Sequence, residues 1–161
     1  MSNINQFQLL YAYHFDTSLC LIVSAQNLAV SQDAKQYEEE NKSIHSILFH
    51  TLSATRSWRI ALETGKRPDP LQDKDYSDLT SLKQAFEQEK LAWEKFLASL
   101  NPEQINQDVE LKSAPDRVFT FKRWKIIQHV ALHGMQHHAE IAALLTRANQ
   151  SPGDIDFIFY S

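Results

Sequence analysis

Four of the seven histidines lie within residues 129–145, in the stretch HVALHGMQHHAEIAALL. Each helical residue turns by about 100°, so His129, His133 and His137 are offset by about 40° per step and form a stripe along one face. Histidines four residues apart on a helix can bind one zinc or similar ion, but a complete site needs a further ligand from elsewhere. The spacing therefore predicts a metal site shared between this helix and another element.

The missing ligand is best sought in a second predicted helix, which begins after Ser43 as N-cap and ends at Gly65 as C-cap. It carries His45 and His50, which are five positions apart and therefore about 140° apart around the axis, so they cannot both face one point. His50 is the better inward candidate because its i−3 and i+4 neighbours are apolar. An isolated histidine on an apolar face is more often a core residue than a ligand, so its role depends on the other histidines.

The remaining pattern predicts an all-α fold, a four-helix bundle, because glycines and prolines are few and apolar residues recur at helical spacing. Two short alternating runs in residues 109–121, separated by SAPD, suit a short hairpin before the last long helix. A bundle allows facing helices to project ligands into a shared interior. The 161 residues fit a single domain, 1–161. The other three helices are expected at residues 5–28, 78–100 and 122–148.

Composition and charge exclude several function classes. The formal net charge of −4 gives no basic footprint, so a nucleic-acid partner is not expected. Neither a signal segment nor an apolar run long enough to span a bilayer is present, which favours a cytoplasmic protein without a membrane partner. The lone Cys20, set among apolar residues, excludes an internal disulfide and a thiolate-rich zinc site, and we expect it to be buried.

The sequence pattern does not decide the roles of two further residues. His14 lies in the first helix, where a hydrogen-bonded structural histidine is favoured over a metal ligand. Glu140 follows His133 by seven residues and is therefore about 20° away on the same face. It could orient a histidine, act on a metal-bound water or form a surface ion pair. The apolar end, DIDFIFYS, is expected to pack back onto the bundle.

The chain resembles the DinB or YfiT-like family of metal-dependent enzymes over nearly its whole length. The resemblance rests on SIHSILFHTLSATRSW, then on FKRWKIIQHVALHGMQHHAEIAALL, and finally on the DIDFIFY ending. It implies a four-helix bundle in which His50, His133 and His137 are the metal ligands. His129 and His138 are then neighbours of the site.

The residues around these ligands depart from the family pattern. After the double histidine the family often has Arg, Gly and Gln, whereas this chain has Ala139, Glu140 and Ile141, and Leu132 replaces a frequent Asn before the first ligand. The implied ligands are retained, so the departures concern the groups that surround the metal.

An open metal site supports two reactions. A zinc-like ion lowers the pKa of bound water to about 7, which suits hydrolysis, and it can equally deprotonate a small thiol cofactor. The resemblance includes thiol-dependent S-transferases and a mycothiol-dependent isomerase. We therefore expect a zinc- or nickel-dependent enzyme with an open coordination position that acts on a small molecule, with thiol transfer slightly ahead of hydrolysis. No catalytic residue is assigned beyond the weak candidate Glu140.

Two other function classes remain. The same ligands would serve a non-catalytic metal-binding or stress-response protein, in which case the coordination shell would be closed. A helical interaction module would bind no metal, and His133→Ala would then leave metal content and thermal stability unchanged. The resemblance is also compatible with a homodimer.

Overall fold

The computed structural model describes residues 4–30, 43–114 and 117–160, and it is dominated by four long helices. These helices match the segments with helical spacing in the sequence. Within these ranges, short helices and a hairpin lie between or after the long helices. The long helices are α1 (Ile4–Val30), α2 (Ile44–Thr64), α3 (Leu79–Ser99) and α5 (Arg123–Arg147); the other elements are η2 (Asp73–Tyr76), α4 (Pro102–Ile105), β1 (Asp108–Ala114), β2 (Arg117–Lys122) and η3 (Phe157–Phe159).

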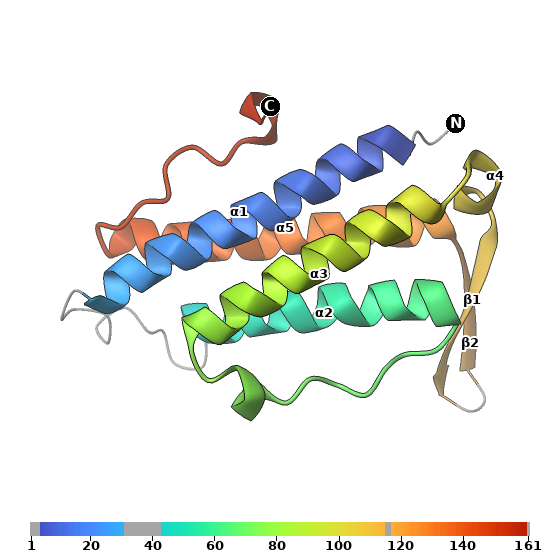
Figure 1. Cartoon of the computed structure of the whole chain (residues 1–161), viewed down its shortest axis with the longest axis horizontal. Coiled ribbons are helices and arrows are strands. Elements are labelled where there is room, and N and C mark those ends of the chain that lie inside the picture. Colours follow the sequence, from blue (N-terminus) through green and yellow to red (C-terminus); the bar gives the residue numbers. More distant parts are fainter. Residues whose placement is uncertain (1–3, 31–42, 115–116, 161) are drawn as a thin grey trace.

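The four helices form a bundle in which each long helix packs against two others (Figure 1). Helix α1 lies between α3 and α5, and α2 lies between the same two helices on the other side, so α1 and α2 touch little. This arrangement confirms the predicted all-α four-helix bundle with a hairpin before the last helix. No helix among the described ranges is both long enough and apolar enough to cross a membrane.

Local sequence signals set the ends of α2 and α3. The Ser43 hydroxyl accepts a hydrogen bond from the Ser46 backbone N–H (3.0 Å), and Gly65 ends α2 with φ 72°, a left-handed conformation that favours glycine. Asp78 and Ser81 form a reciprocal capping box at the start of α3. Both predicted caps of α2 are confirmed, and with them the placement of the helix that carries His50.

An aromatic pair joins all four helices in the core. The rings of Tyr11 in α1 and Trp93 in α3 stack with centroids 4.1 Å apart. The Tyr11 hydroxyl donates to the carbonyl of Ile127 in α5 (3.0 Å), and the Trp93 indole N–H donates to the carbonyl of Thr55 in α2 (3.3 Å). Each buried polar tip therefore has a partner, and the stack fixes α1 and α3 against the two helices that carry the candidate ligands.

A buried ion pair fixes α2 to α3. The Arg59 guanidinium donates to both carboxylate oxygens of Glu89, at 2.6 and 2.8 Å, and also to Glu63 (2.8 Å). Burial raises the pKa of the Glu89 carboxyl, and the bidentate contact with Arg59 opposes that shift. The paired geometry satisfies both charges, so loss of Arg59 would leave the Glu89 carboxylate buried without this partner.

The hairpin lies at the end of the bundle where α2 ends and α5 begins (Figure 1). Its strands are antiparallel, with Val109 opposite Phe121 and Leu111 opposite Phe119. The side chains of Val109 and Leu111 are buried, whereas Phe119 and Phe121 remain partly exposed. The hairpin therefore covers the end of the core and leaves aromatic surface beside the start of α5.

The C-terminal segment contacts α1, as expected, but the side chains of Ile158 and Phe159 remain exposed. The Tyr13 hydroxyl donates to the Ile155 carbonyl, the Tyr160 hydroxyl donates to Asp16, and the rings of Phe157 and Tyr13 meet edge to face at 5.1 Å.

The expectation that Cys20 is buried is wrong. Its side chain is exposed, although the adjacent Leu21 and Ile22 are fully buried. The cause is helical geometry, because the core-facing stripe of α1 passes through Ser18, Leu21 and Ala25, and Cys20 lies off that stripe. Local apolar composition around a cysteine therefore did not indicate its orientation.

Candidate metal centre

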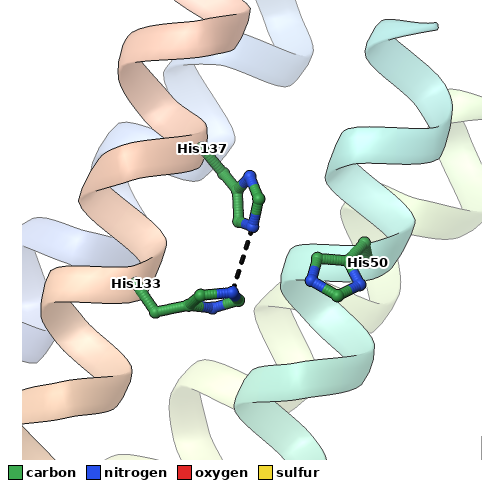
Figure 2. A group of neighbouring side chains, drawn as sticks. All are labelled: His50, His133 and His137. Atoms are coloured by element: carbon green, nitrogen blue, oxygen red, sulfur yellow. Dashed lines mark hydrogen bonds between the residues drawn. The ribbon is translucent and has the colours of Figure 1, made fainter. Parts of the chain in front are cut away.

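His50, His133 and His137 meet between α2 and α5, although more than eighty residues separate the first from the other two (Figure 2). One ring nitrogen from each lies within 4.8 Å of the others. The Nε2 atoms of His133 and His137 are 3.2 Å apart. Their rings are perpendicular to each other, and the His50 ring lies edge to face with both, at centroid distances of 5.3 and 5.0 Å. The structure thus brings together the three residues that the sequence singles out.

The donor set fits a divalent transition ion. Metal–nitrogen bonds of 2.0–2.1 Å at tetrahedral angles place neighbouring donor atoms about 3.3 Å apart, close to the 3.2 Å between the two Nε2 atoms. Three imidazoles suit zinc, nickel, copper or iron, whereas calcium and magnesium prefer oxygen ligands. Among the described His, Cys, Asp and Glu side chains, no fourth belongs to this group.

The electrostatics of the cluster favour neutral imidazoles. Burial lowers the pKa of His133, and the neighbouring His137, His50 and His129 lower it further. Burial also lowers the pKa of His50, with His137 as the next cause. A protonated imidazole cannot bind a metal, so these environments keep the lone pairs available near neutral pH.

Glu140 fixes the orientation of His137. Its carboxylate lies 3.0 Å from His137 Nδ1, which therefore donates a hydrogen bond to it. With the proton on Nδ1, the Nε2 lone pair points toward His133 and His50. A carboxylate behind a histidine ligand is a common arrangement at metal sites, and it raises the basicity of the ligand. Of the three roles left open for Glu140, the geometry supports orientation of a histidine.

The other surface histidines lie outside the cluster. His45 faces the loop after α2, where its Nε2 donates to the Tyr76 carbonyl (2.6 Å), so His45 lies away from the cluster that contains His50. His129 is exposed and lies one turn from His133, with ring centroids 6.1 Å apart, and its other neighbour is Trp58 at 5.7 Å.

A second histidine pair, not predicted from the sequence, is buried behind the cluster. The rings of His14 and His138 stack at 4.9 Å, and both side chains are fully inaccessible. The Ser18 hydroxyl donates to the His14 carbonyl (2.9 Å) and accepts from His138 Nε2 (2.8 Å). This assigns the His138 proton to Nε2 and supports the expectation that His138 is a neighbour of the site.

The expectation of a hydrogen-bonded His14 is wrong. Within the described part of the chain, neither of its ring nitrogens has a hydrogen-bond partner. Its ring packs against the backbone at Gly134, where an added Cβ would lie 2.2 Å from His14 Cε1. Burial lowers the pKa of His14 to about 4, so the ring is neutral at pH 7. Gly134, directly after His133, is the sequence feature that could have indicated this close contact, because a mid-helix glycine often marks close packing.

The fold and the cluster together define a helical bundle with a three-histidine site between its second and last long helices. The DinB family profile matches residues 1–161, the whole chain. The protein therefore belongs to the DinB family. No curated protein matches the chain in a sequence search.

Proposed function

We propose that His50, His133 and His137 bind a divalent transition metal ion, zinc or nickel, and that the protein is a metal-dependent enzyme acting on a small molecule. The observation that carries the proposal is the convergence of three imidazole nitrogens within 4.8 Å, with no fourth protein ligand among the described residues. Three protein ligands with a remaining position are typical of catalytic zinc sites, whereas structural sites are usually closed by four.

Each residue of the site would have its own role. The three histidines hold the ion, and the exposed edge of His50 leaves the cluster accessible from solvent. Glu140 keeps the His137 proton on Nδ1 and so presents Nε2 as a donor. The proton between His133 Nε2 and His137 Nε2 belongs to His133, because Glu140 holds the His137 proton on Nδ1. For His133 to hold a metal through Nε2, its neutral ring would carry that proton on Nδ1.

A bound ion would supply Lewis acidity, which lowers the pKa of a coordinated water or thiol and makes the deprotonated form available near neutral pH. Thiol S-transfer is our first choice and hydrolysis the second. In the transfer, the thiolate sulfur forms a bond to an electrophilic carbon, the leaving group departs with the bonding electrons, and the thiol proton passes to solvent.

The test loads the protein with zinc or nickel and supplies a panel of thiols, glutathione, cysteine and coenzyme A, together with 1-chloro-2,4-dinitrobenzene. A parallel assay uses p-nitrophenyl acetate for hydrolysis. His133→Ala serves as the site variant and His45→Ala as the matched control, since His45 lies on α2 outside the cluster. Thioether formation that needs both the metal and His133 supports S-transfer.

A direct readout of thiol binding avoids dependence on the chosen electrophile. In cobalt-loaded protein, a thiol that coordinates the ion produces a sulfur-to-cobalt charge-transfer absorption, which His133→Ala should abolish. A stoichiometric metal with neither thiol coordination nor ester cleavage would refute the proposed enzyme and favour the non-catalytic metal-binding or stress-response alternative.

A further inference from the structure

A pocket of about 220 Å³ lies beside the histidine cluster, in the groove between α2 and α5 and under the hairpin. None of the three candidate ligands lines it, so it adjoins the histidine cluster without including the ligands. Its wall is largely apolar and aromatic, with one lysine at its edge. The lining residues are Trp58, Phe121, Lys125, Ile126 and His129.

One histidine connects the pocket to the cluster. The His129 ring lies 5.7 Å from the Trp58 ring on the pocket side and 6.1 Å from the His133 ring on the other side. His129 and His133 are one helical turn apart on α5, about 6 Å along the axis. The pocket therefore lies about one helical turn from His133, the nearest candidate ligand.

The charges around the pocket are positive. Lys125 forms no salt bridge within the described ranges, and it lies in the first turn of α5, where the helix dipole also favours an anion. The guanidinium of Arg67 lies over the Trp58 ring, 5.0 Å from its centroid, and makes no ion pair with any described carboxylate. Among the residues that the structure describes, no acidic side chain lines the pocket.

From these features we infer that the pocket is the substrate-binding part of the metal centre and takes a small carboxylate with an aromatic or branched apolar body. This inference rests on the proposed function, because it assigns the substrate class of the same site. The volume suffices for a phenyl group, since an apolar cavity of about 150 Å³ can hold benzene. Trp58, Phe121 and Ile126 contact the apolar body, and Lys125, which lines the pocket, attracts the carboxylate.

The binding test uses 3-phenylpropionate and its uncharged amide, 3-phenylpropanamide, as probes in ¹⁵N–¹H NMR titrations of the whole protein. The indole N–H signal of Trp58 reports the pocket. That of Trp124, which lines a separate cavity between α1, α5 and the C-terminal segment, is an internal control. We expect the Trp58 signal alone to shift, with the carboxylate binding about fivefold more tightly than the amide, as for one favourable partly exposed ion pair.

Matched lysine variants separate charge recognition from apolar contact. Lys125→Met should bring the affinity for the carboxylate down to that for the amide. Lys95→Met, an exposed lysine on α3, should leave the fivefold preference intact. Equal affinity of the two probes in the unmodified protein, or a shift of Trp124 in place of Trp58, would overturn the inference.

Adjacency to the metal is tested with cobalt-loaded protein. Bound 3-phenylpropionate should show paramagnetic broadening that is lost in His133→Ala, while that variant still binds the probe. Binding without broadening in the cobalt-loaded protein would separate the pocket from the metal centre and refute the assignment. Unmodified protein that takes up no stoichiometric zinc, nickel or cobalt but binds the carboxylate through Lys125 would instead refute the proposed function and leave the anion pocket standing.

Discussion

Adding a methyl group at Gly134 should destabilise the protein, although the same change in an ordinary helix is stabilising. Glycine costs a helix about 1 kcal/mol relative to alanine. In this structure, however, the new Cβ of Gly134→Ala would lie 2.2 Å from His14 Cε1 and 2.4 Å from Nδ1. Both are far below van der Waals contact, and the His14 ring is fully buried, so it cannot move into solvent without displacing its neighbours.

The magnitude follows from two opposing terms. Overpacking a core costs about 1–3 kcal/mol or more, and the gain in helix propensity offsets about 1 kcal/mol of it. We expect a net loss of about 2 kcal/mol, which for a chain of this size lowers the melting temperature by about 4–8 °C. Urea unfolding followed by circular dichroism measures the loss directly.

The control is the same substitution in a His14→Ala background, where the clash is absent. There Gly134→Ala should be neutral or stabilise by up to about 1 kcal/mol, so the double-mutant cycle gives a coupling energy of about 2–3 kcal/mol. Equal effects of the substitution in the two backgrounds, or stabilisation in the unmodified protein, would refute the packing of His14 on Gly134.

Three further predictions concern the ligand support, the buried histidine and the ion pair. Glu140→Gln should weaken metal binding by about 10–100-fold in a chelator competition assay, and unchanged affinity would contradict its role in orienting His137. His14 has a folded pKa of about 4 against 6.5 unfolded, so the unfolded state takes up the proton first as pH falls between these values. Because buried His14 stays neutral, the free energy of unfolding of metal-free protein should be about 2 kcal/mol lower at pH 5 than at pH 7.5. A pH profile of stability that His14→Ala does not flatten would refute this. Arg59→Ala should lower the free energy of unfolding by about 3–5 kcal/mol because it leaves Glu89 unpaired. Lys122→Ala, which removes an exposed ion pair, should lower it by less than about 1 kcal/mol. Similar losses in the two variants would contradict the distinction between the buried and the exposed pair.

Much of the fold was predictable because its signals are local. Helical spacing of apolar residues located the four long helices, and cap residues such as Ser43 and Gly65 located the ends of α2. The alternating runs located the hairpin. Each of these features depends on the backbone preferences and side-chain facing of a short segment, so it can be inferred without knowledge of the packing.

The candidate site was predictable in part. The stripe on α5 indicated His133 and His137, and helix facing favoured His50 over His45 as the ligand from α2, although the His50 side chain is exposed. The choice among the remaining histidines needed the resemblance to the family, because helix facing alone does not determine which side chains meet. His138, for example, directly follows His137 in the sequence but turns by about 100° into the core.

Features that depend on packing between helices were not predictable. His14 looked suited to a hydrogen bond, but its position against Gly134 leaves no partner within reach among the described residues. Cys20 looked buried from its apolar neighbours, yet it lies off the core stripe of α1. The pocket beside His129 combines Trp58, Phe121 and Lys125 from three separate elements, and no local pattern connects them.

The central claim is that His50 completes a metal site with the histidines of α5, and metal content tests it most directly. Protein purified without chelators, loaded with zinc and dialysed should contain a single ion per chain by elemental analysis. His50→Ala and His133→Ala should lose the ion, whereas His45→Ala, the matched change on α2, should retain it. Full metal content in His50→Ala, or no stoichiometric ion in the unmodified protein, would contradict the account.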